Sequence, residues 1–201
     1  MNIIIFSSTL IFCVILFFTL QRSKKKEADA NAEFWARERK ANFTRKKSLD
    51  GLNYVTIPDE ILHMQPSCAT EELKNCLKDL NDLSAYPIVN LTGYTNTDLK
   101  LEYGTANINI LSDYDFHYTN LVTLLQKLAE LLHENDADSE AIHVLEFAVS
   151  THTDVSKSYY LLAELYRCQG TPEKIKDLIQ EAQELRSLSK NNILQTLQNL
   201  L

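Results

Sequence analysis

Histidine, acidic and nucleophilic side chains are the groups in this sequence that could bind a metal ion or carry out catalysis. The five histidines are His63, His117, His133, His143 and His152. None stands three to five residues from another, the spacing at which two imidazoles on one element hold zinc, and no H-E-x-x-H pair is present. We therefore expect no metal site and no cofactor.

Short motifs for catalysis or calcium binding are also absent. No G-x-S-x-G motif marks a nucleophilic serine. Asp113 with Asp115, and Asp136 with Asp138, form two acidic stretches, but neither has the glycine and glutamate that a calcium loop needs further along. We interpret both as helix starts, with Asp136 or Asp138 capping the helix that contains Ala141. The sequence thus predicts no catalytic residue and a protein that is not an enzyme.

The cysteines do not form a recognisable framework. They are Cys13, Cys68, Cys76 and Cys168. No C-x-x-C pair occurs, and Cys13 lies in the first apolar run, which leaves an odd number for the rest of the chain. We expect free thiols in a reducing compartment rather than a disulfide or zinc framework.

Charge divides the chain into two opposite parts. Residues 22–47 hold ten basic and four acidic side chains, a net charge of +6, which leaves −13 for the rest of a chain whose total is −7. An acidic body repels the phosphate backbone, so nucleic acid is excluded as a partner of the whole protein. Few glycines and prolines, with abundant Leu, Glu, Lys, Ala and Gln, favour an all-α fold.

The first residues predict a membrane anchor. Residues 3–20 carry no charge, and as a helix they would rise about 27 Å, close to the ~30 Å hydrocarbon core of a bilayer. Basic residues follow this run, beginning at Arg22, and none precedes it. The positive-inside rule then predicts a single-pass anchor at 1–21 in the cell membrane, with the lipid bilayer around residues 3–20 and the C-terminal body in the cytoplasm. The alternative is a cleaved signal peptide, which would export the body.

Residues 22–55 are expected to form a basic juxtamembrane stalk helix and a joint. The residues expected at the membrane surface are Arg22, Lys24, Lys25, Lys26, Phe34 and Trp35. The basic side chains would attract anionic lipid headgroups at roughly 1 kcal/mol each, and the two aromatic rings would enter the interface. A solvated stalk without lipid contact is the alternative. Asp50 and Gly51 predict a turn, and residues 54–57 an extended segment before Pro58.

Residues 56–120 are expected to form a helical and irregular subdomain. Thr70 predicts a helix start, and Leu73, Cys76, Leu77, Leu80 and Leu83 follow at the spacing of one apolar face. Apolar residues alternate on both sides of Gly104, which is typical of a small hairpin. Irregular turns and short helices are the alternative, which we favour slightly.

A repeat with a period of about 34 residues begins near residue 121. The matching pairs are Leu125 with Tyr159, Leu128 with Leu162, Ala129 with Ala163, Leu132 with Tyr166, Ala141 with Ile175, Leu145 with Ile179, and Ala148 with Ala182. Gly170 stands in the second turn, and the first turn, at residues 133–136, lacks glycine. Pro172 follows Thr171, a pattern typical of a helix start.

This pattern resembles tetratricopeptide repeats, which have the same period. The resemblance covers residues 122–189 and is degenerate, because Leu125 and Tyr159 replace the consensus Trp and alanine replaces the consensus Gly. It implies two paired-helix units at 121–188. Two units are fewer than the roughly three that an independent stack needs, so a capping helix is expected at 189–201. An ordinary antiparallel bundle is the alternative.

A longer pattern also resembles a known group. The apolar run, the FWARERKAN stretch at 34–42, the RKK cluster at 45–47 and YVTIP at 54–58 resemble uncharacterised small membrane proteins of clostridial-type bacteria. The resemblance implies a place in the membrane and no activity.

The sequence therefore predicts an all-α protein: a transmembrane helix, then a helical body that ends in a two-unit repeat stack with a capping helix. Stacked helical pairs form concave surfaces that hold peptides, so we expect a scaffold or adaptor that binds an unknown protein or peptide. The candidate partner-binding residues are Lys127, Lys157, Tyr160 and Arg167. The alternatives are a subunit of a membrane-associated enzyme, with a site in residues 59–120, and an exported helical domain.

Overall fold

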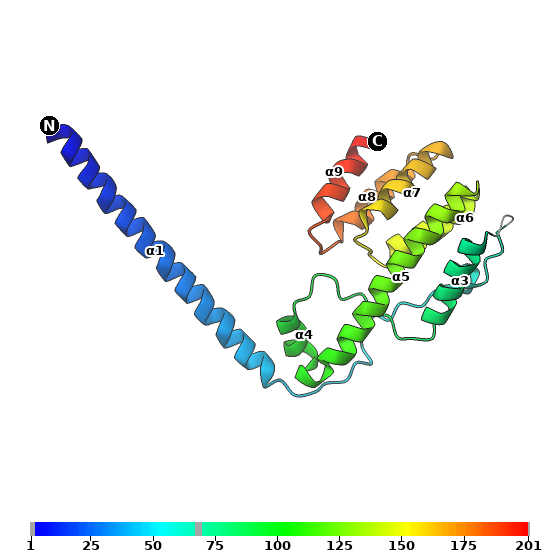
Figure 1. Ribbon diagram of the computed structural model, residues 1–201, viewed down its shortest axis with the longest axis horizontal. Coiled ribbons are helices and arrows are strands. Elements are labelled where there is room, and N and C mark those ends of the chain that lie inside the picture. The colour runs from blue at the N-terminus through cyan, green and yellow to red at the C-terminus, as the bar shows by residue number, and fades with distance from the viewer. Residues whose placement is uncertain (1–2, 67–69, 201) are drawn as a thin grey trace. The chain divides into compact units, whose positions relative to one another are not determined.

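The computed structural model describes residues 3–66 and 70–200, and every regular element in these ranges is a helix (Figure 1). The helices are α1 (Ile3–Asn42), α2 (Asp59–Leu62), α3 (Glu71–Leu83), α4 (Asn96–Tyr103), the 3₁₀ helix η1 (Thr105–Asn107), α5 (Ile108–Glu134), α6 (Asp138–Ser150), α7 (Ser156–Cys168), α8 (Lys174–Gln183) and α9 (Lys190–Leu200). An isolated antiparallel bridge joins Tyr54 to Val89. The all-α prediction is confirmed.

The described chain forms two compact units. The first contains residues 3–47 and 96–107, and the second contains residues 48–66, 70–95 and 108–200. In the first unit, α4 packs against the C-terminal part of α1. Glu38 of α1 accepts hydrogen bonds from the ammonium group of Lys100 and the hydroxyl of Thr97, and these bonds lower the pKa of its carboxyl group.

The chain beyond α1 is held against the end of α4 by backbone contacts. The Lys47 N–H donates to the Tyr103 carbonyl at 3.0 Å, and the buried Asn107 amide donates to the carbonyls of both residues at 2.8 Å. Gly104 has a φ of +88°, and a Cβ placed on it would lie 2.3 Å from the Arg45 carbonyl oxygen. Only glycine fits this position, because it needs a left-handed backbone and no side chain.

The N-terminal helix does not have the expected anchor character. No helix in the described residues combines the length and the apolar character that crossing a bilayer requires. Charged residues follow from Arg22 without a break in α1. The predicted single-pass anchor at 1–21, with the bilayer around residues 3–20, and the cell-membrane location are therefore wrong. The placement of the body in the cytoplasm depended on that anchor and loses its basis.

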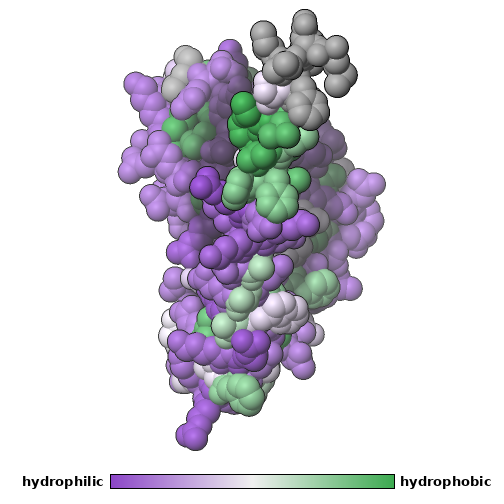
Figure 2. Space-filling model, turned by 90° about the vertical axis from the view of Figure 1, so that its left-hand side faces the viewer, coloured by the Kyte–Doolittle hydropathy of each residue, from purple (hydrophilic) through white to green (hydrophobic). Residues whose placement is uncertain are grey.

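The large apolar side chains in this part of α1 are nevertheless exposed. Their exposed fractions range from 41% to 61% between Leu10 and Leu20. In Figure 2, which faces the N-terminal end of α1, part of this group is visible as green surface near the top. No other described element of the first unit covers these side chains.

The second unit is built around α5. α3 packs on α5, α5 on α6, and α6 on α7, and α7 and α8 both pack on α9. α3 begins as expected, because the Thr70 hydroxyl accepts a hydrogen bond from the Leu73 N–H at 3.3 Å. Small residues stand where the paired helices approach closely. Ala129, Ala148, Ala163 and Ala182 are all completely buried.

The turn between α5 and α6 and the turn between α7 and α8 contain the same kind of backbone hydrogen bond. The Ala137 N–H donates to the Leu132 carbonyl at 2.9 Å, and the Thr171 N–H donates to the Tyr166 carbonyl at 2.9 Å. Asp136 has a φ of +58°, and Gly170, one repeat period later, has a φ of +73°. The two pairs therefore share the left-handed turn that commonly ends a helix.

Several local expectations differ from the structure. Around Gly104 the favoured prediction of short helices is confirmed and the hairpin is wrong, because α4, η1 and the start of α5 flank this glycine. α5 begins at Ile108, so Asp113 and Asp115 lie inside a helix rather than at its start. Ala137 precedes α6 without a side-chain cap, and the Asp138 carboxylate instead lies 2.6 Å from His133 Nδ1. α8 begins at Lys174, and the Thr171 hydroxyl bonds back to a carbonyl of α7 instead of capping α8.

We predict that Gly104→Ala destabilises the attachment of residues 43–47 to α4 by about 1–3 kcal/mol, because the substitution adds backbone strain and a clash with Arg45. Hydrogen exchange of the α4 amides would measure the loss as faster exchange. Gly51→Ala is the matched control, since a Cβ there meets nothing within 4 Å. Equal exchange rates in the two variants would contradict the prediction.

We also predict that Cys76 is inert towards thiol reagents in the folded protein. Its Sγ is buried and donates to the Leu124 carbonyl, and burial raises the pKa of the thiol to about 11. With Cys76 as the sole cysteine, Ellman's reagent at pH 8 should react about 100-fold more slowly than with the exposed Cys168 as the sole cysteine. Comparable rates would show that the thiol is accessible.

The same pKa shift gives a pH dependence. An unfolded thiol ionises near its ordinary pKa of 9, whereas the folded thiol keeps its proton until about pH 11. Cys76 therefore contributes stability below pH 9 that is lost as the pH rises towards 11. A Cys76→Ala variant should lose less stability over that interval than the parent protein, as measured by urea unfolding. Cys68, the remaining cysteine of the second unit, lies outside the described residues.

Candidate functional site

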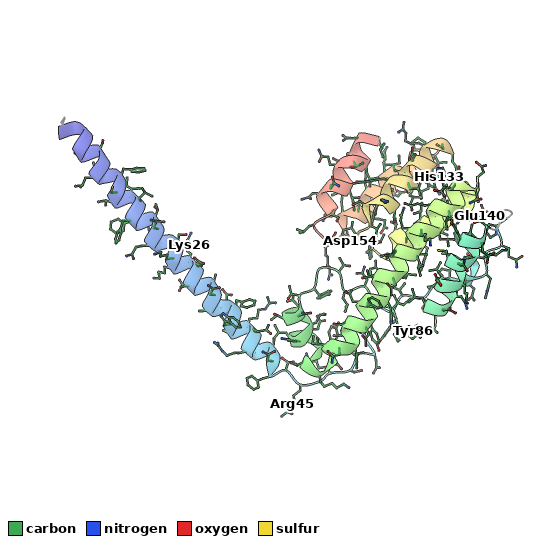
Figure 3. All side chains as sticks on the ribbon, in the orientation of Figure 1. Lys26, Arg45, Tyr86, His133, Glu140 and Asp154 are labelled. Carbon is green, nitrogen blue, oxygen red and sulfur yellow. The ribbon has the colours of Figure 1, made fainter. Side chains whose placement is uncertain are left out.

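A groove between α5 and α7 is the site that best combines exposed charge with a fixed framework. Its hollow has a volume of about 230 Å³. The lining residues are Gln126, Glu130, His133 and Glu134 from α5, and Lys157, Tyr160, Leu161 and Glu164 from α7. In Figure 3, His133 is labelled near the C-terminal end of α5.

One hydrogen bond joins the two helices in the groove, and a second, within α5, completes the pairing of the same side chain. The buried Ser158 hydroxyl donates to Gln126 Oε1 at 2.6 Å, and Gln126 Nε2 donates to Glu130 Oε1 at 2.9 Å. Both ends of the Gln126 amide are therefore satisfied, as a buried amide requires. The Lys157 ammonium lies 3.7 Å from Glu130, so this lysine is partly neutralised within the groove.

Tyr160 connects the groove to α9. Its phenolic oxygen accepts hydrogen bonds from Asn192 at 3.1 Å and from Thr196 at 3.3 Å. The ring is half-buried, with one side against the packed helices and the other towards the groove. An aromatic ring fixed in this way loses little conformational freedom when a ligand covers it.

The charge of the groove is negative. Three carboxylates, of Glu130, Glu134 and Glu164, face the single ammonium group of Lys157. Within the described residues, no ion pair involves Glu134 or Glu164. Such a surface attracts cationic groups and repels anionic ones.

The structure brings together only two of the four residues expected to bind a partner. Lys157 and Tyr160 line the groove. Lys127 is exposed on the side of α5 that faces α3, where its charge acts on the Cys76 thiol, and Arg167 is exposed in the last turn of α7, outside the groove.

The glutamates of the groove were missed by the sequence analysis. A signal for them was present, because shifting the sequence by one repeat period aligns Glu130 with Glu164. The candidates chosen from the sequence, Lys127, Lys157, Tyr160 and Arg167, gave no indication of these carboxylates.

The six residues expected at a membrane surface all lie on α1 and are exposed. Figure 3 labels one of them, Lys26. The Phe34 and Trp35 rings contact each other edge to face, with centroids 5.3 Å apart. Contact of these residues with anionic lipid headgroups stays a prediction.

A larger and more polar cleft lies elsewhere in the second unit. Its volume is about 570 Å³, and its walls come from residues 53–56, residues 90–94, the end of α6 and the residues after α8. Gly93 lies so close to Arg186 that a Cβ on the glycine would be 2.6 Å from the arginine Cβ, and the Arg186 guanidinium stands 5.2 Å from the centre of the Tyr94 ring. These contacts fix one wall of the cleft.

The opposite wall of this cleft is fixed by Asn90. Its amide donates to the Thr151 carbonyl at 2.8 Å and to the Tyr118 hydroxyl at 3.0 Å. Tyr118 in turn donates to the same carbonyl, and burial raises the pKa of its phenol to about 12. The clamp holds the turn after α6, in which His152 has a left-handed φ of +58°. The polar groups of Asn90 and Tyr118 thus serve the turn rather than a ligand.

The part of the chain that the structure describes contains no cluster of side chains that could bind a metal ion. No three histidine, cysteine, aspartate or glutamate side chains come together there in a way that could hold a metal ion.

Comparison with known proteins does not assign this chain to a family. No family model, no curated protein and no solved structure matches this chain. The expected membership in a group of small clostridial-type membrane proteins is wrong, because no match supports it and the spanning helix that carried the resemblance is not found among the described residues.

Proposed function

We propose that this protein is a non-enzymatic interaction module, a scaffold or adaptor, that holds a basic peptide of a partner protein in the α5–α7 groove. The observation that carries the proposal is the pair of glutamates Glu134 and Glu164, which line the same groove and have no ion-pair partner within the described residues. Two uncompensated carboxylates suit a ligand with several positive charges.

We further propose that α5 with α6 and α7 with α8 are two tetratricopeptide-like units, with α9 as the capping helix. The equivalent hydrogen bonds in the two turns, the left-handed residues Asp136 and Gly170, and the buried alanines at matching positions support this interpretation. Stacks of this kind form concave surfaces that hold peptides. The α5–α7 groove is lined by the first helix of each proposed unit, which supports it as the place where a peptide binds.

The carboxylates of the groove that have no ion-pair partner indicate the charge of the peptide. Lys157 is held beside Glu130, whereas Glu134 and Glu164 have no ion-pair partner in the described chain. Lysine or arginine side chains would therefore find carboxylates that are not already compensated. The half-buried Tyr160 ring adds a surface for the aliphatic stems of such side chains.

We predict that a lysine-rich peptide of about twelve residues binds the full chain and that Glu134→Lys/Glu164→Lys weakens this binding at least about tenfold, because two attractive charges become repulsive. Fluorescence polarisation of the labelled peptide at low salt would measure the dissociation constant. Binding should also weaken as salt is added.

The matched control is Glu72→Lys/Glu173→Lys, which changes the net charge by the same amount at two exposed positions outside the groove. We expect this variant to bind within about twofold of the parent protein. If both double variants lost affinity equally, the peptide would be responding to net charge, and the groove would not be its site.

A further inference from the structure

A third hollow lies between α3 and α5, with a volume of about 490 Å³. The residues that define it, which we call the aromatic surface, are Asp79, Asp82, Tyr86, Phe116, His117 and Leu124. Its two largest rings face water: Phe116 is 63% exposed and Tyr86 is 56% exposed. Figure 3 labels Tyr86, just beyond the end of α3.

The aromatic side chains of this surface are held in place before any partner arrives. His117 Nδ1 lies 2.8 Å from the Pro87 carbonyl, which can only accept, so Nδ1 carries the hydrogen. The Tyr86 ring lies against the same imidazole, with centroids 5.0 Å apart, and the Phe116 ring centroid is 6.3 Å from it. Fixed aromatic rings at the centre of a hollow are typical of the residues that contribute most to protein binding.

The rim of the aromatic surface is acidic. Asp79 and Asp82 stand three residues apart on α3, and both line the hollow. Neither takes part in an ion pair within the described residues. A partner that covers the rings would therefore gain most if it placed basic side chains beside these two carboxylates.

The backbone of α3 and α5, which form the walls of the hollow, indicates the conformation of the partner peptide. α3 and α5 have their main-chain groups paired within the helices, so an extended peptide would find no strand edge with which to pair along this hollow. A helical peptide forms its own backbone hydrogen bonds and presents side chains at spacings of three and four residues. The same spacings separate Phe116 from Asn120 on α5, and Asp79 from Asp82 on α3.

We propose that the aromatic surface binds an amphipathic helix of a second partner protein, with an apolar stripe on Phe116 and Tyr86 and lysine or arginine beside Asp79 and Asp82. The aromatic surface and the α5–α7 groove have no lining residue in common. The protein would thus hold two partners at once, and the proposal stands or falls independently of the groove.

The test uses the full chain and a labelled amphipathic helical peptide with a leucine stripe flanked by lysines. A second peptide has glutamate in place of the lysines, and a third has serine in place of the leucines. We expect binding of the first peptide alone. Phe116→Ser should weaken it at least about tenfold, and Asp79→Asn/Asp82→Asn, which keeps the shape of the surface, should weaken it severalfold and reduce its salt dependence.

Phe43→Ser is the matched control, because Phe43 is 87% exposed and lies outside the aromatic surface. We expect no change of affinity in this variant, and none in Glu134→Lys/Glu164→Lys, which tests the groove separately. Circular dichroism should show equal helix content in all variants.

Three results would overturn the proposal. The first is equal binding of the lysine and glutamate peptides, or no binding of either. The second is an equal loss of affinity in Phe116→Ser and Phe43→Ser. The third is a dimer of the parent protein in light scattering that Phe116→Ser converts to a monomer, since this would assign the aromatic surface to a second copy of the chain.

Discussion

The packing of α5 is the constraint on which the second unit depends. Its apolar residues are buried against α3 on one side and α6 on another, with Leu121, Leu125, Leu128 and Leu132 completely inaccessible to water. A helix enclosed in this way fixes the position of everything that contacts it, because close-packed side chains allow few alternative arrangements. The Ser158–Gln126 hydrogen bond then sets the register of α7 along it.

Because α5 is buried along two flanks, its remaining positions are divided between two narrow stripes. Gln126, Glu130 and Glu134 recur at every fourth position and face the groove, whereas Phe116, Asn120 and Thr123 follow a separate stripe beside α3. The first stripe carries two glutamates, and the second carries the exposed Phe116 ring beside polar side chains. A single rigid element therefore presents two different chemistries, and neither surface can shift without the core moving too.

Helix capping and the spacing of apolar residues correctly predicted α3. Thr70 caps α3, and the leucines after it form the buried face, as their spacing indicates. The start of α5 could not be found in the same way, because Asp113 and Asp115 are typical of turns, and the packing of Leu111 and Tyr118 against the core decides the outcome. The α1 prediction depended on the apolar character of one run. The choice of partner-binding residues depended on a guess about which exposed residues matter. In both cases sequence pattern alone lacked the three-dimensional information.

The turns after α5 and α7 show how two different residues can make the same backbone bend. Asp136 and Gly170 differ in every chemical respect, yet both adopt the same left-handed dihedral and close the same ring of backbone atoms. Aspartate tolerates this conformation better than most non-glycine residues do, at a modest energetic cost. The two turns are therefore alike in their backbone conformation although their residue types differ, and a substitution at either position is tolerated only if the new residue can adopt a positive φ.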